Sequence, residues 1–413
     1  MRATRLQLRD FRSYEQAELR LGPELTVIAG CNGAGKTNLL EGVYFACTGR
    51  SCRTANEREA VRFGAALCRL ELHTEDALGT HAIGVGFEPG EPKRLTVDGA
   101  AVERLTDASA RPLVSVFLPD RLDLVLGAPA LRRGHLDQVV AALWPGRIEA
   151  RRAYAAALAQ RNALVAAVRS GRASRGSLPA WDAELARHGV VLMRDRAEAV
   201  DGLREPFTRH AEALGLEGGA ELGYRPRSTV DPADALAADA LAAELAERTP
   251  GDLERGFTGH GPHRDELSLR RAGRELRAYG SRGQQRLGLL ALLLAERERL
   301  AEARGAPPLL LLDDVMSELD GTRRARLVEV LRTEGQSVIT TTELAHVPGA
   351  EDARVEKVAV AGGRVLHGAD AAADEPPGIG AFPAAGAAGV VGDASAGSGA
   401  PALAAPPPER LAG

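Results

Sequence analysis

Gly30-Cys31-Asn32-Gly33-Ala34-Gly35-Lys36-Thr37 is the stretch that decides the fold of this chain. It fits the phosphate-binding pattern GxxxxGK[ST] without a mismatch. Residues 25–29 (LTVIA), which precede it, form a short apolar run rich in β-branched side chains and predict a buried strand. Residues 38–46 (NLLEGVYFA), which follow it, carry apolar side chains at helical spacing. A strand, a glycine loop and a helix in this order predict a phosphate-binding loop.

The chemistry of such a loop gives its residues distinct roles. Glycines allow the backbone N–H groups of residues 30–37 to surround an anion, and the N-terminus of the following helix adds positive potential. We expect Lys36 to reach the β- and γ-phosphates of ATP and Thr37 to bind Mg²⁺ through its hydroxyl. The alternative is a glycine turn with a surface lysine. Only three of the 52 Lys and Arg residues are lysines, so a lysine at the one position that the motif requires argues against that alternative.

Composition limits the class of protein. The 413 residues suffice for two domains, or for one large domain with an insertion. Hydrophobic residues make up 45% of the chain and charged residues 26%, as in an ordinary soluble protein, and the net charge is −4, so a nucleic-acid partner would need a local basic patch. Four cysteines without a CxxC pair indicate reduced thiols and a cytoplasmic protein. The N-terminus has no apolar signal core, and no run is long enough to span a membrane.

The pattern of residues changes three times along the chain. Residues 1–120 predict mixed β structure around the phosphate loop, with antiparallel strands over 70–102 and a hairpin turn at Asp98-Gly99. Residues 121–255 are rich in Ala, Arg, Glu and Leu at helical spacing, most clearly over 147–169 and 233–249. They predict a helical lobe inserted into the first domain, which resumes over residues 256–367. Residues 368–413 have few large apolar side chains and predict a disordered tail.

A second part of the site is expected where a buried strand ends in two acids. Leu309-Leu310-Leu311-Leu312 precedes Asp313 and Asp314. We expect this strand to lie parallel and adjacent to the phosphate-loop strand, so that Asp313 binds Mg²⁺. Asp314 would then orient or deprotonate the attacking water. The alternative for these acids is a helix-capping role.

A third part opens a leucine-rich helix. Ser281 and Gln284 have the spacing of a capping box, which is a sufficient structural explanation for both. The same geometry allows Ser281, Gly283 and Gln284 to form a second phosphate cradle at a helix N-terminus. The position of this segment shortly before the acidic strand matches ATPases of the ABC type, in which it reaches the γ-phosphate on the other subunit of a dimer.

Several stretches together resemble the RecF family of bacterial recombination-repair ATPases, which is related to the heads of SMC proteins. The resemblance covers about residues 1–367, and its two most specific stretches lie over 119–137 and 261–265. The stretches are Leu8-Arg9-Asp10-Phe11-Arg12-Ser13-Tyr14; Gly30 to Asn38; Pro119-Asp120 with Leu124-Val125-Leu126-Gly127-Ala128-Pro129, Arg132-Arg133 and Leu136-Asp137; Gly261-Pro262-His263-Arg264-Asp265; and Asp313-Asp314-Val315-Met316-Ser317-Glu318-Leu319-Asp320 with Arg323 and Leu327.

The resemblance implies that Asn38 belongs to the nucleotide site, and it implies a fold and a function. The fold is an α/β, ABC-type P-loop ATPase head: a mixed sheet with an antiparallel subdomain and an inserted α-helical lobe. The disordered tail over 368–413 lies outside the resemblance and is expected from composition alone. The function is ATP-driven homodimerisation on double-stranded DNA and on junctions between single and double strands, with weak DNA-stimulated hydrolysis as the switch that releases the DNA. The implied partners are RecR and RecO, which help to load RecA on gapped DNA, and the implied processes are DNA replication, recombinational repair and the SOS response.

This chain departs from the expected patterns at three places. His135 stands where the family pattern has an aromatic residue, which predicts weaker packing there. Asp314 stands where transporter ATPases carry Glu, so a shorter side chain predicts slow turnover. Thr340-Thr341-Thr342 occurs in place of the switch histidine of transporter ATPases, and no glutamine is confidently assigned to a Q-loop.

Other candidate residues leave two interpretations open. Arg132, Arg133, Arg151 and Arg152 could contact DNA phosphates, or form ion pairs and a solvated face.

His260, His263 and Asp265 suggest a metal site but lack a full ligand set. Arg12 and Tyr14 could contact nucleotide or form a pair at a strand end. For the whole chain, the alternative function is an ABC-type motor subunit of a transporter. The segment GSRGQQR in place of LSGGQ argues against that alternative, as does a lobe of roughly 130 residues by the sequence patterning.

Overall fold

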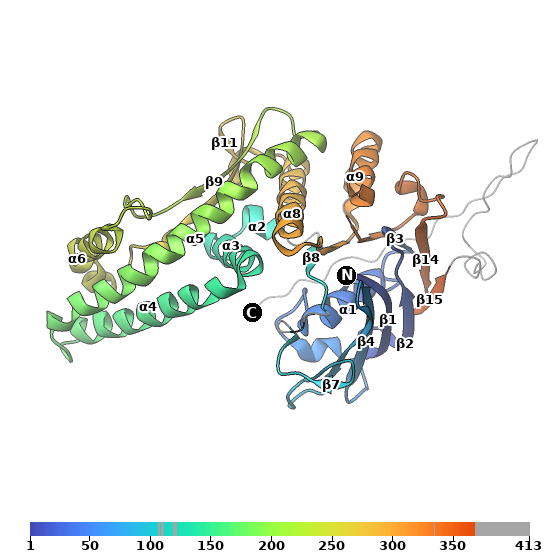
Figure 1. Ribbon diagram of the computed structural model, residues 1–413, viewed down its shortest axis with the longest axis horizontal. Helices are drawn as coiled ribbons and strands as arrows, with labels where there is room; N and C mark the ends of the chain where they lie inside the picture. Colours follow the sequence, from blue (N-terminus) through green and yellow to red (C-terminus); the bar gives the residue numbers. More distant parts are fainter. Residues whose placement is uncertain (106–107, 109–110, 119–121, 334, 368–413) are drawn as a thin grey trace, which may run out of the picture. The chain divides into compact units, whose positions relative to one another are not determined.

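A computed structural model describes residues 1–105, 108, 111–118, 122–333 and 335–367 (Figure 1). The expected tail, 368–413, and the Pro119-Asp120 motif lie outside the described residues. Within the described part, no helix combines the length and apolar character needed to cross a membrane. All four cysteines are free thiols.

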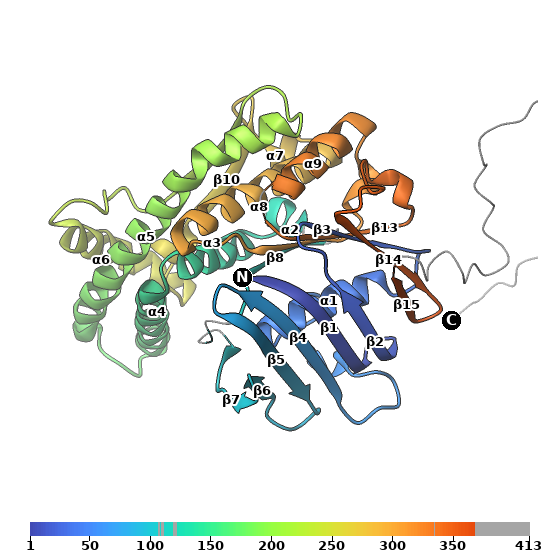
Figure 2. The same ribbon diagram turned by 45° about the vertical axis from the view of Figure 1, so that its right-hand side comes forward.

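The N-terminal region forms an antiparallel sheet of six strands in the order β2-β1-β4-β5-β6-β7 (Figure 2). The strands are β1 (Arg2–Phe11), β2 (Tyr14–Arg20), β4 (Cys68–Asp76), β5 (Gly79–Phe87), β6 (Arg94–Val97) and β7 (Ala100–Ala101). Alternate side chains such as Leu70, Leu72 and Ile83 are buried, because one face of the sheet packs on the core. Asp98 and Gly99 both have positive φ, 50° and 80°, as a two-residue hairpin turn requires. These features confirm the antiparallel strands and the hairpin expected from the sequence.

A second sheet of six strands carries the phosphate loop, in the order β15-β14-β3-β13-β12-β8. The strands are β3 (Leu25–Ala29), β8 (Val114–Phe117), β12 (Leu309–Leu312), β13 (Ser337–Thr341), β14 (Val355–Ala361) and β15 (Arg364–His367). All neighbours pair in parallel except β14 and β15.

One expectation about this sheet is wrong. The acidic strand β12 is parallel to the phosphate-loop strand β3 but not adjacent to it, because β13 pairs with both and lies between them. All five residues of β13 are buried, as in a strand that is covered on both faces and on both edges. The sequence pattern identified each strand as buried but carried no information about lateral order.

Helix α1 (Lys36–Thr48) begins at the phosphate loop and lies between the two sheets. Its buried side chains, including Leu39, Leu40 and Val43, share one hydrophobic cluster with residues of both sheets. A Cβ at Gly42 would lie 3.0 Å from the Leu8 side chain, so the helix approaches β1 closely. This packing fixes the start of α1, and with it the phosphate loop, relative to both sheets.

The inserted lobe is largely helical, as expected. Its helices are α2 (Asp123–Leu126), α3 (Pro129–Leu143), α4 (Ile148–Arg169), α5 (Leu178–Ala213) and α6 (Ala237–Arg255), and α5 packs along α8 (Arg282–Arg304). The remaining helices are α7 (Leu276–Tyr279) and α9 (Gly321–Thr333). The helix predicted over 233–249 begins and ends later in the chain than expected.

The boundary predicted at residue 255 cuts through one small sheet. Strand β9 (Ala220–Arg225) lies inside the lobe and pairs with β10 (Glu266–Arg271), which in turn pairs with β11 (Arg274–Glu275). Strand β10, which follows the predicted boundary, is therefore hydrogen-bonded to a strand that precedes it.

Candidate nucleotide-binding site

The phosphate loop has the backbone conformation that its glycines permit. Gly33 and Gly35 have φ of 82° and 111°, a region that L side chains rarely adopt. A Cβ at Gly30 would lie 2.4 Å from the carbonyl oxygen of Val360, so no larger residue fits there. Lys36 Nζ donates hydrogen bonds to the carbonyl oxygens of Gly30 (2.7 Å) and Cys31 (3.0 Å), which holds its charge over the loop.

Thr37 and Asp313 meet although 276 residues separate them. Thr37 Oγ1 donates to the two carboxylate oxygens of Asp313 at 3.0 and 2.9 Å. Hydroxyl and carboxylate oxygens suit Mg²⁺, which usually keeps several waters and takes few protein ligands. The pair therefore fits the expected magnesium site, even though the described residues contain no cluster of three or more His, Cys, Asp and Glu side chains able to hold a metal.

Thr340 is a site residue whose role sequence reasoning missed. It comes from β13, the strand between β3 and β12, and its buried Oγ1 donates to Asp313 Oδ1 at 2.6 Å. The same oxygen accepts a hydrogen bond from the backbone N–H of Asp314 at 2.9 Å. One hydroxyl thus orients both acids. The position of Thr340 at the end of a buried strand could have indicated a site residue. Only the lateral order of the strands, however, shows that this strand end lies beside Asp313 and Asp314.

Asp314 has an unusual environment for a carboxylate. Its backbone is left-handed, with φ 45°, which is uncommon for a residue other than glycine. Ser317 Oγ donates to Asp314 Oδ2 at 3.1 Å, whereas the buried Oδ1 has no hydrogen-bond partner in the described part. A strained backbone and an unsatisfied buried acceptor support a functional role for this acid.

These residues line one cleft of about 310 Å³. The lining residues are Asn32, Gly33, Gly35, Lys36, Thr37, Asn38, Arg53, Asp313 and Asp314. Ser281, Gly283 and Gln284 do not line it, so the expected third part of the site is separate from the phosphate loop within one chain. The capping box itself is confirmed: the Ser281 hydroxyl accepts from Gln284 N (3.3 Å), and Gln284 Oε1 accepts from Ser281 N (2.9 Å).

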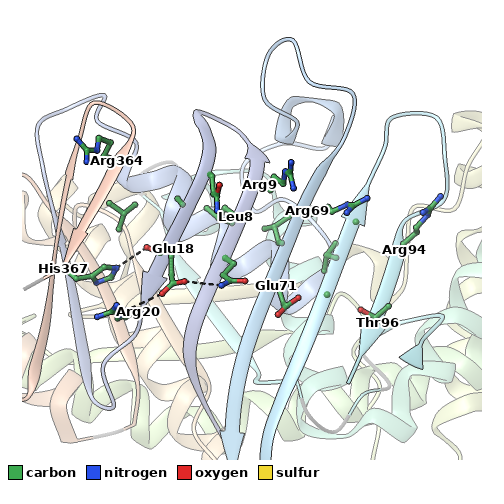
Figure 3. Close-up of a pocket in the computed structure, with 18 residues that line it drawn as sticks. Leu8, Arg9, Glu18, Arg20, Arg69, Glu71, Arg94, Thr96, Arg364 and His367 are labelled. Atoms are coloured by element: carbon green, nitrogen blue, oxygen red, sulfur yellow. Dashed lines mark hydrogen bonds and ion pairs between the residues drawn. The ribbon is translucent and has the colours of Figure 1, made fainter. Parts of the chain in front are cut away.

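A larger hollow of about 730 Å³ lies over the outer face of the N-terminal sheet and is a different feature (Figure 3). Its lining includes Arg9 of β1, Arg69 of β4 and Arg94 of β6, together with Gly84 and Gly86 of β5, the strand between β4 and β6. Neither the phosphate loop nor the acidic pair contributes to it. The volume of a pocket therefore does not identify the nucleotide site. The convergence of Lys36, Thr37 and Asp313 identifies it.

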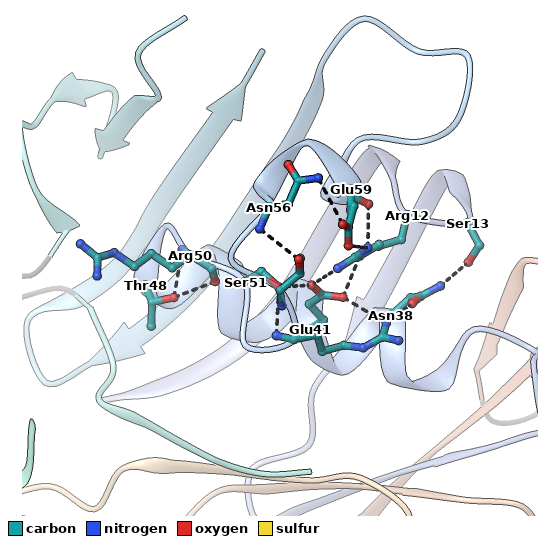
Figure 4. Close-up of polar contacts among 11 residues, drawn as sticks. Arg12, Ser13, Asn38, Glu41, Thr48, Arg50, Ser51, Asn56 and Glu59 are labelled. Carbon is teal, nitrogen blue, oxygen red and sulfur yellow. Dashed lines mark hydrogen bonds and ion pairs between the residues drawn. The ribbon is translucent and has the colours of Figure 1, made fainter. Parts of the chain in front are cut away.

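A buried carboxylate, Glu41 of α1, organises the side chains beside the cleft (Figure 4). Arg12 donates to both of its oxygens at 2.6 and 2.8 Å, and Ser51 Oγ donates at 2.5 Å. Arg53 lies 3.3 Å from Glu41 and donates to Asn38 Oδ1 at 2.9 Å. Arg12 is thus engaged in an ion pair with a residue of helix α1, which is neither of the two roles considered for it. Glu41 and Arg53 were not expected from the sequence, since no local motif contains them.

Tyr14 supports the phosphate loop directly. Its hydroxyl donates to the carbonyl oxygen of Gly35 at 3.1 Å. Burial raises the pKa of the Tyr14 hydroxyl above its usual value, so the group stays protonated and remains a donor. A Cβ at Gly35 would lie 2.5 Å from this hydroxyl oxygen, which is a second reason for glycine at that position.

The arginines considered for DNA contact differ in their surroundings. Arg132 is 3% exposed, forms a two-point ion pair with Glu266 (2.6 and 3.0 Å) and donates to two backbone carbonyl oxygens. The DNA-contact hypothesis for Arg132 is therefore corrected, because its guanidinium is buried and bonded to Glu266 and to two carbonyl oxygens inside the protein. Arg151 pairs with Asp137 (3.1 Å) and Arg152 with Glu149 (2.7 Å), and both remain largely exposed.

Two histidine expectations are settled by their partners. His135 lies 2.6 Å from Glu296 and is nearly buried with it, so a polar pair, and not a packing defect, replaces the expected aromatic residue. His263 contacts the Tyr154 hydroxyl (2.7 Å) and the carbonyl oxygen of Thr258 (2.9 Å). Burial lowers the pKa of His263 to about 4, so its ring is neutral and structural near pH 7.

Comparison with known proteins gives three findings. The model of a family described as "AAA domain" matches residues 5–92. The DNA replication and repair protein RecF of Anaeromyxobacter sp. (strain Fw109-5) is 41% identical over 353 residues, which cover 83% of this chain and 93% of that protein. RecF of Herpetosiphon aurantiacus is 37% identical over 367 residues, covering 83% and 94%.

Solved structures agree with these relatives. The structure of the recombination mediator protein RecF-ATPrS in the RecFOR pathway has a TM-score of 0.77 at 26% identity, and covers 89% of this chain and 98% of that one. The SMC head bound to the C-terminal winged-helix domain of ScpA has a TM-score of 0.55 at 16% identity, covering 89% and 97%. The second likeness concerns the fold alone.

Proposed function

This chain belongs to the RecF family of DNA replication and repair proteins, and we propose that it is an ATP-controlled clamp on DNA. The observation that carries the proposal is the convergence of Lys36, Thr37 and Asp313 on one cleft. A motor subunit of a transporter, which shares a phosphate loop and an acidic strand, has no support from these relatives.

ATP is the proposed ligand of the cleft, with its phosphates over the N–H groups of residues 30–37. Lys36 would exchange its hydrogen bonds to the carbonyl oxygens of Gly30 and Cys31 for bonds to the β- and γ-phosphates. Thr37 and Asp313 would hold Mg²⁺, which neutralises phosphate charge when bound. Neither change requires a movement of the fold.

Asp314 is the proposed general base for hydrolysis. Its unsatisfied Oδ1 can accept a proton from a water molecule, and Thr340 holds its backbone in place. Aspartate is one methylene shorter than glutamate, so the water would be less well placed and hydrolysis slow. Slow hydrolysis suits a switch whose bound state must persist.

The active unit is proposed to be a homodimer with ATP between the subunits. Ser281 and Gly283 are exposed at the start of α8 and lie outside the cleft of their own chain, so the signature segment of one subunit would complete the site of the other. ATP favours the dimer over ADP because only the γ-phosphate makes these extra contacts. DNA, either double-stranded or at a junction with a single strand, would be held by the dimer and released on hydrolysis. RecR and RecO are the proposed partners in loading RecA on gapped DNA.

The direct test is Lys36→Ala. We expect the variant to fold with an unchanged melting temperature in the absence of nucleotide and to lose most of its ATP affinity, because Lys36 contacts loop carbonyl oxygens and little of the core. Lys357→Ala, which removes a lysine that does not line the cleft, is the matched control. Unchanged ATP affinity of a folded Lys36→Ala protein would refute the proposed nucleotide site.

A further inference from the structure

The two stretches of sequence most specific to the family contact each other on the helical lobe. Neither of them lines the ATP cleft. The first opens α3 and includes Arg132 and Arg133; the second is Gly261-Pro262-His263-Arg264-Asp265, before β10. Arg132 pairs with Glu266, and Arg133 Nη1 donates to the carbonyl oxygen of Asp265 at 2.9 Å. These bonds join the start of α3 to the turn that precedes β10.

A buried ionic network beneath the turn fixes its conformation. Asp265, fully buried, accepts hydrogen bonds from the Tyr224 hydroxyl, from the backbone N–H of Arg227 (2.7 Å) and from Arg196. Arg196 also pairs with Asp137 (2.8 Å) and donates to the carbonyl oxygen of Pro262 (2.7 Å). The charges below the turn are thus paired with one another.

A pocket of about 640 Å³ opens over this junction, and its described lining contains no carboxylate. The lining residues are Ala128, Pro129, Ala130, Arg133, Arg227, Arg248, Arg255, Phe257, Gly259, His260 and Arg264. Five of them are arginines. Such a concentration of one sign of charge in a pocket attracts an anion and raises its local concentration.

Three of these arginines have no compensating charge. Arg227, Arg248 and Arg264 are exposed, and none of them lies within 4.0 Å of a carboxylate in the described part of the chain. Arg255 shares Asp252 with the buried Arg161, and His260 pairs with Glu244 at 2.7 Å. Burial is the main cause that lowers the pKa of Arg133; Arg196 and Arg264 lower it as well, whereas Glu266 and Asp265 oppose the shift.

An aromatic ring lies among these cations. Phe257 is 42% exposed although it is a large apolar side chain, and the guanidinium carbon of Arg264 lies 5.3 Å from its ring centroid. Exposed aromatic rings beside arginines are the arrangement with which proteins bind single-stranded nucleic acid, because the ring stacks on a base while the arginines contact phosphates. A site for a small anion alone would not need the ring.

We propose that this pocket binds one strand of nucleic acid, with phosphates on Arg227, Arg248 and Arg264 and a base against Phe257. The proposal rests on the proposed function, which requires DNA, and assigns a single-strand contact to the helical lobe. Guanidinium groups suit the site because they contact phosphates in two-point geometry and stay charged at any physiological pH.

The test is the affinity of the full-length protein for a fluorescent oligothymidylate, measured by anisotropy over a range of salt concentrations. Arg227→Gln/Arg248→Gln should weaken binding and make the slope of log affinity against log salt shallower by about 1.4, since each lost single-strand phosphate contact accounts for about 0.7. Arg58→Gln/Arg175→Gln removes the same charge from exposed sites outside the pocket and should leave affinity and slope near wild type. Equal losses in the two double variants would overturn the proposal.

Phe257→Ala tests the stacked base. It should weaken binding of the oligothymidylate on the order of tenfold and leave binding of an abasic strand of the same length unchanged. An equal loss for both strands would overturn the role of Phe257. Inorganic tripolyphosphate at matched ionic strength should compete poorly; strong competition would mean that the pocket is a site for free polyphosphate.

The outcomes separate this inference from the proposed function. If the wild-type protein binds DNA and Arg227→Gln/Arg248→Gln binds it equally well, the pocket assignment alone fails. If the wild-type protein binds ATP but no DNA, with or without nucleotide, both fail. The pocket variants should keep wild-type ATP affinity, because none of their residues lines the ATP cleft.

Discussion

At the residue scale, the candidate ATP site depends on a few oxygen atoms that the fold places within hydrogen-bond distance. Thr37, Asp313 and Thr340 form one chain of hydrogen bonds, and the backbone N–H of Asp314 is attached to its end. Together these bonds join the start of α1, the residues that follow β12, and β13. The consequences of removing single groups are therefore specific.

Asp314→Asn should block hydrolysis while ATP binding is retained. The amide has almost the same shape but cannot accept a proton from water, so ATP should remain bound and the dimer should persist. Single-turnover hydrolysis and equilibrium ATP binding measure the two effects. Asp313→Asn is the contrast, since loss of the carboxylate that Thr37 contacts should lower Mg²⁺-dependent ATP affinity. Hydrolysis by Asp314→Asn at the wild-type rate would exclude Asp314 as the base.

Thr340→Val should impair the site without changing its volume. The buried hydroxyl donates to Asp313 and accepts from Asp314 N, so its removal leaves a buried N–H unsatisfied at a cost of about 1–3 kcal/mol. We expect a lower melting temperature and slower hydrolysis. Thr342→Val, on the same segment but outside this chain of bonds, is the control; a wild-type hydrolysis rate in Thr340→Val would show that Thr340 does not orient the acids.

At the scale of elements, the N-terminus of α8 is the segment whose role depends on a second subunit. Its capping box accounts for the stability of the helix start, while Ser281 and Gly283 stay exposed. A Cβ at Gly283 would meet no atom within 4 Å, so nothing inside the subunit requires glycine there. An approaching phosphate group would require it.

Ser281→Arg should block ATP-driven dimerisation and leave ATP binding by the monomer nearly intact. Loss of the cap costs about 1 kcal/mol, too little to unfold the protein, while the arginine side chain would fill the cradle. Ser281→Thr, which keeps a hydroxyl at the cap, is the control.

Light scattering with ATP and with ADP measures the dimer. Mixing Ser281→Arg with Lys36→Ala should restore hydrolysis, because each mixed dimer contains one intact composite site. Normal dimerisation of Ser281→Arg, or a wild-type protein that stays monomeric with saturating ATP and DNA, would contradict the trans arrangement.

At the scale of the whole molecule, buried ion pairs hold the lobe together. Arg161 of α4 is fully buried and pairs with Asp182 of α5 (2.6 Å) and Asp252 of α6 (2.7 Å). Thr258, beyond α6, also accepts from it at 2.8 Å. One guanidinium therefore connects three helices to the segment that forms the basic pocket.

Arg161→Leu should destabilise the lobe by about 3–5 kcal/mol, because it leaves the carboxylate of Asp182 buried without its ion-pair partner and that of Asp252 with Arg255 alone. Chemical denaturation measures the loss, with the exposed Arg187→Leu as control. Burial already raises the pKa of Asp182, and without Arg161 it should rise further. A carboxyl whose folded-state pKa is raised favours the folded state at low pH, so the deficit should shrink as the pH falls. A deficit that grows with acidification would contradict this account.

The sequence by itself determined the local chemistry of this protein. Phosphate loop, hairpin turn and capping box each depend on residues close together in the chain, whose backbone preferences act locally: glycines at positive φ, Asp98-Gly99 in the turn, and Ser281 with Gln284 at the start of α8. Only the tertiary structure decided which other segments these local elements contact. It placed β13 between β3 and β12, made Thr340 part of the site, and buried Arg132 against Glu266. Lateral strand order and long-range ion pairs arise from packing between segments that are distant in the sequence. The hydrophobic pattern of a single segment shows which face is buried but does not specify which segment packs beside it.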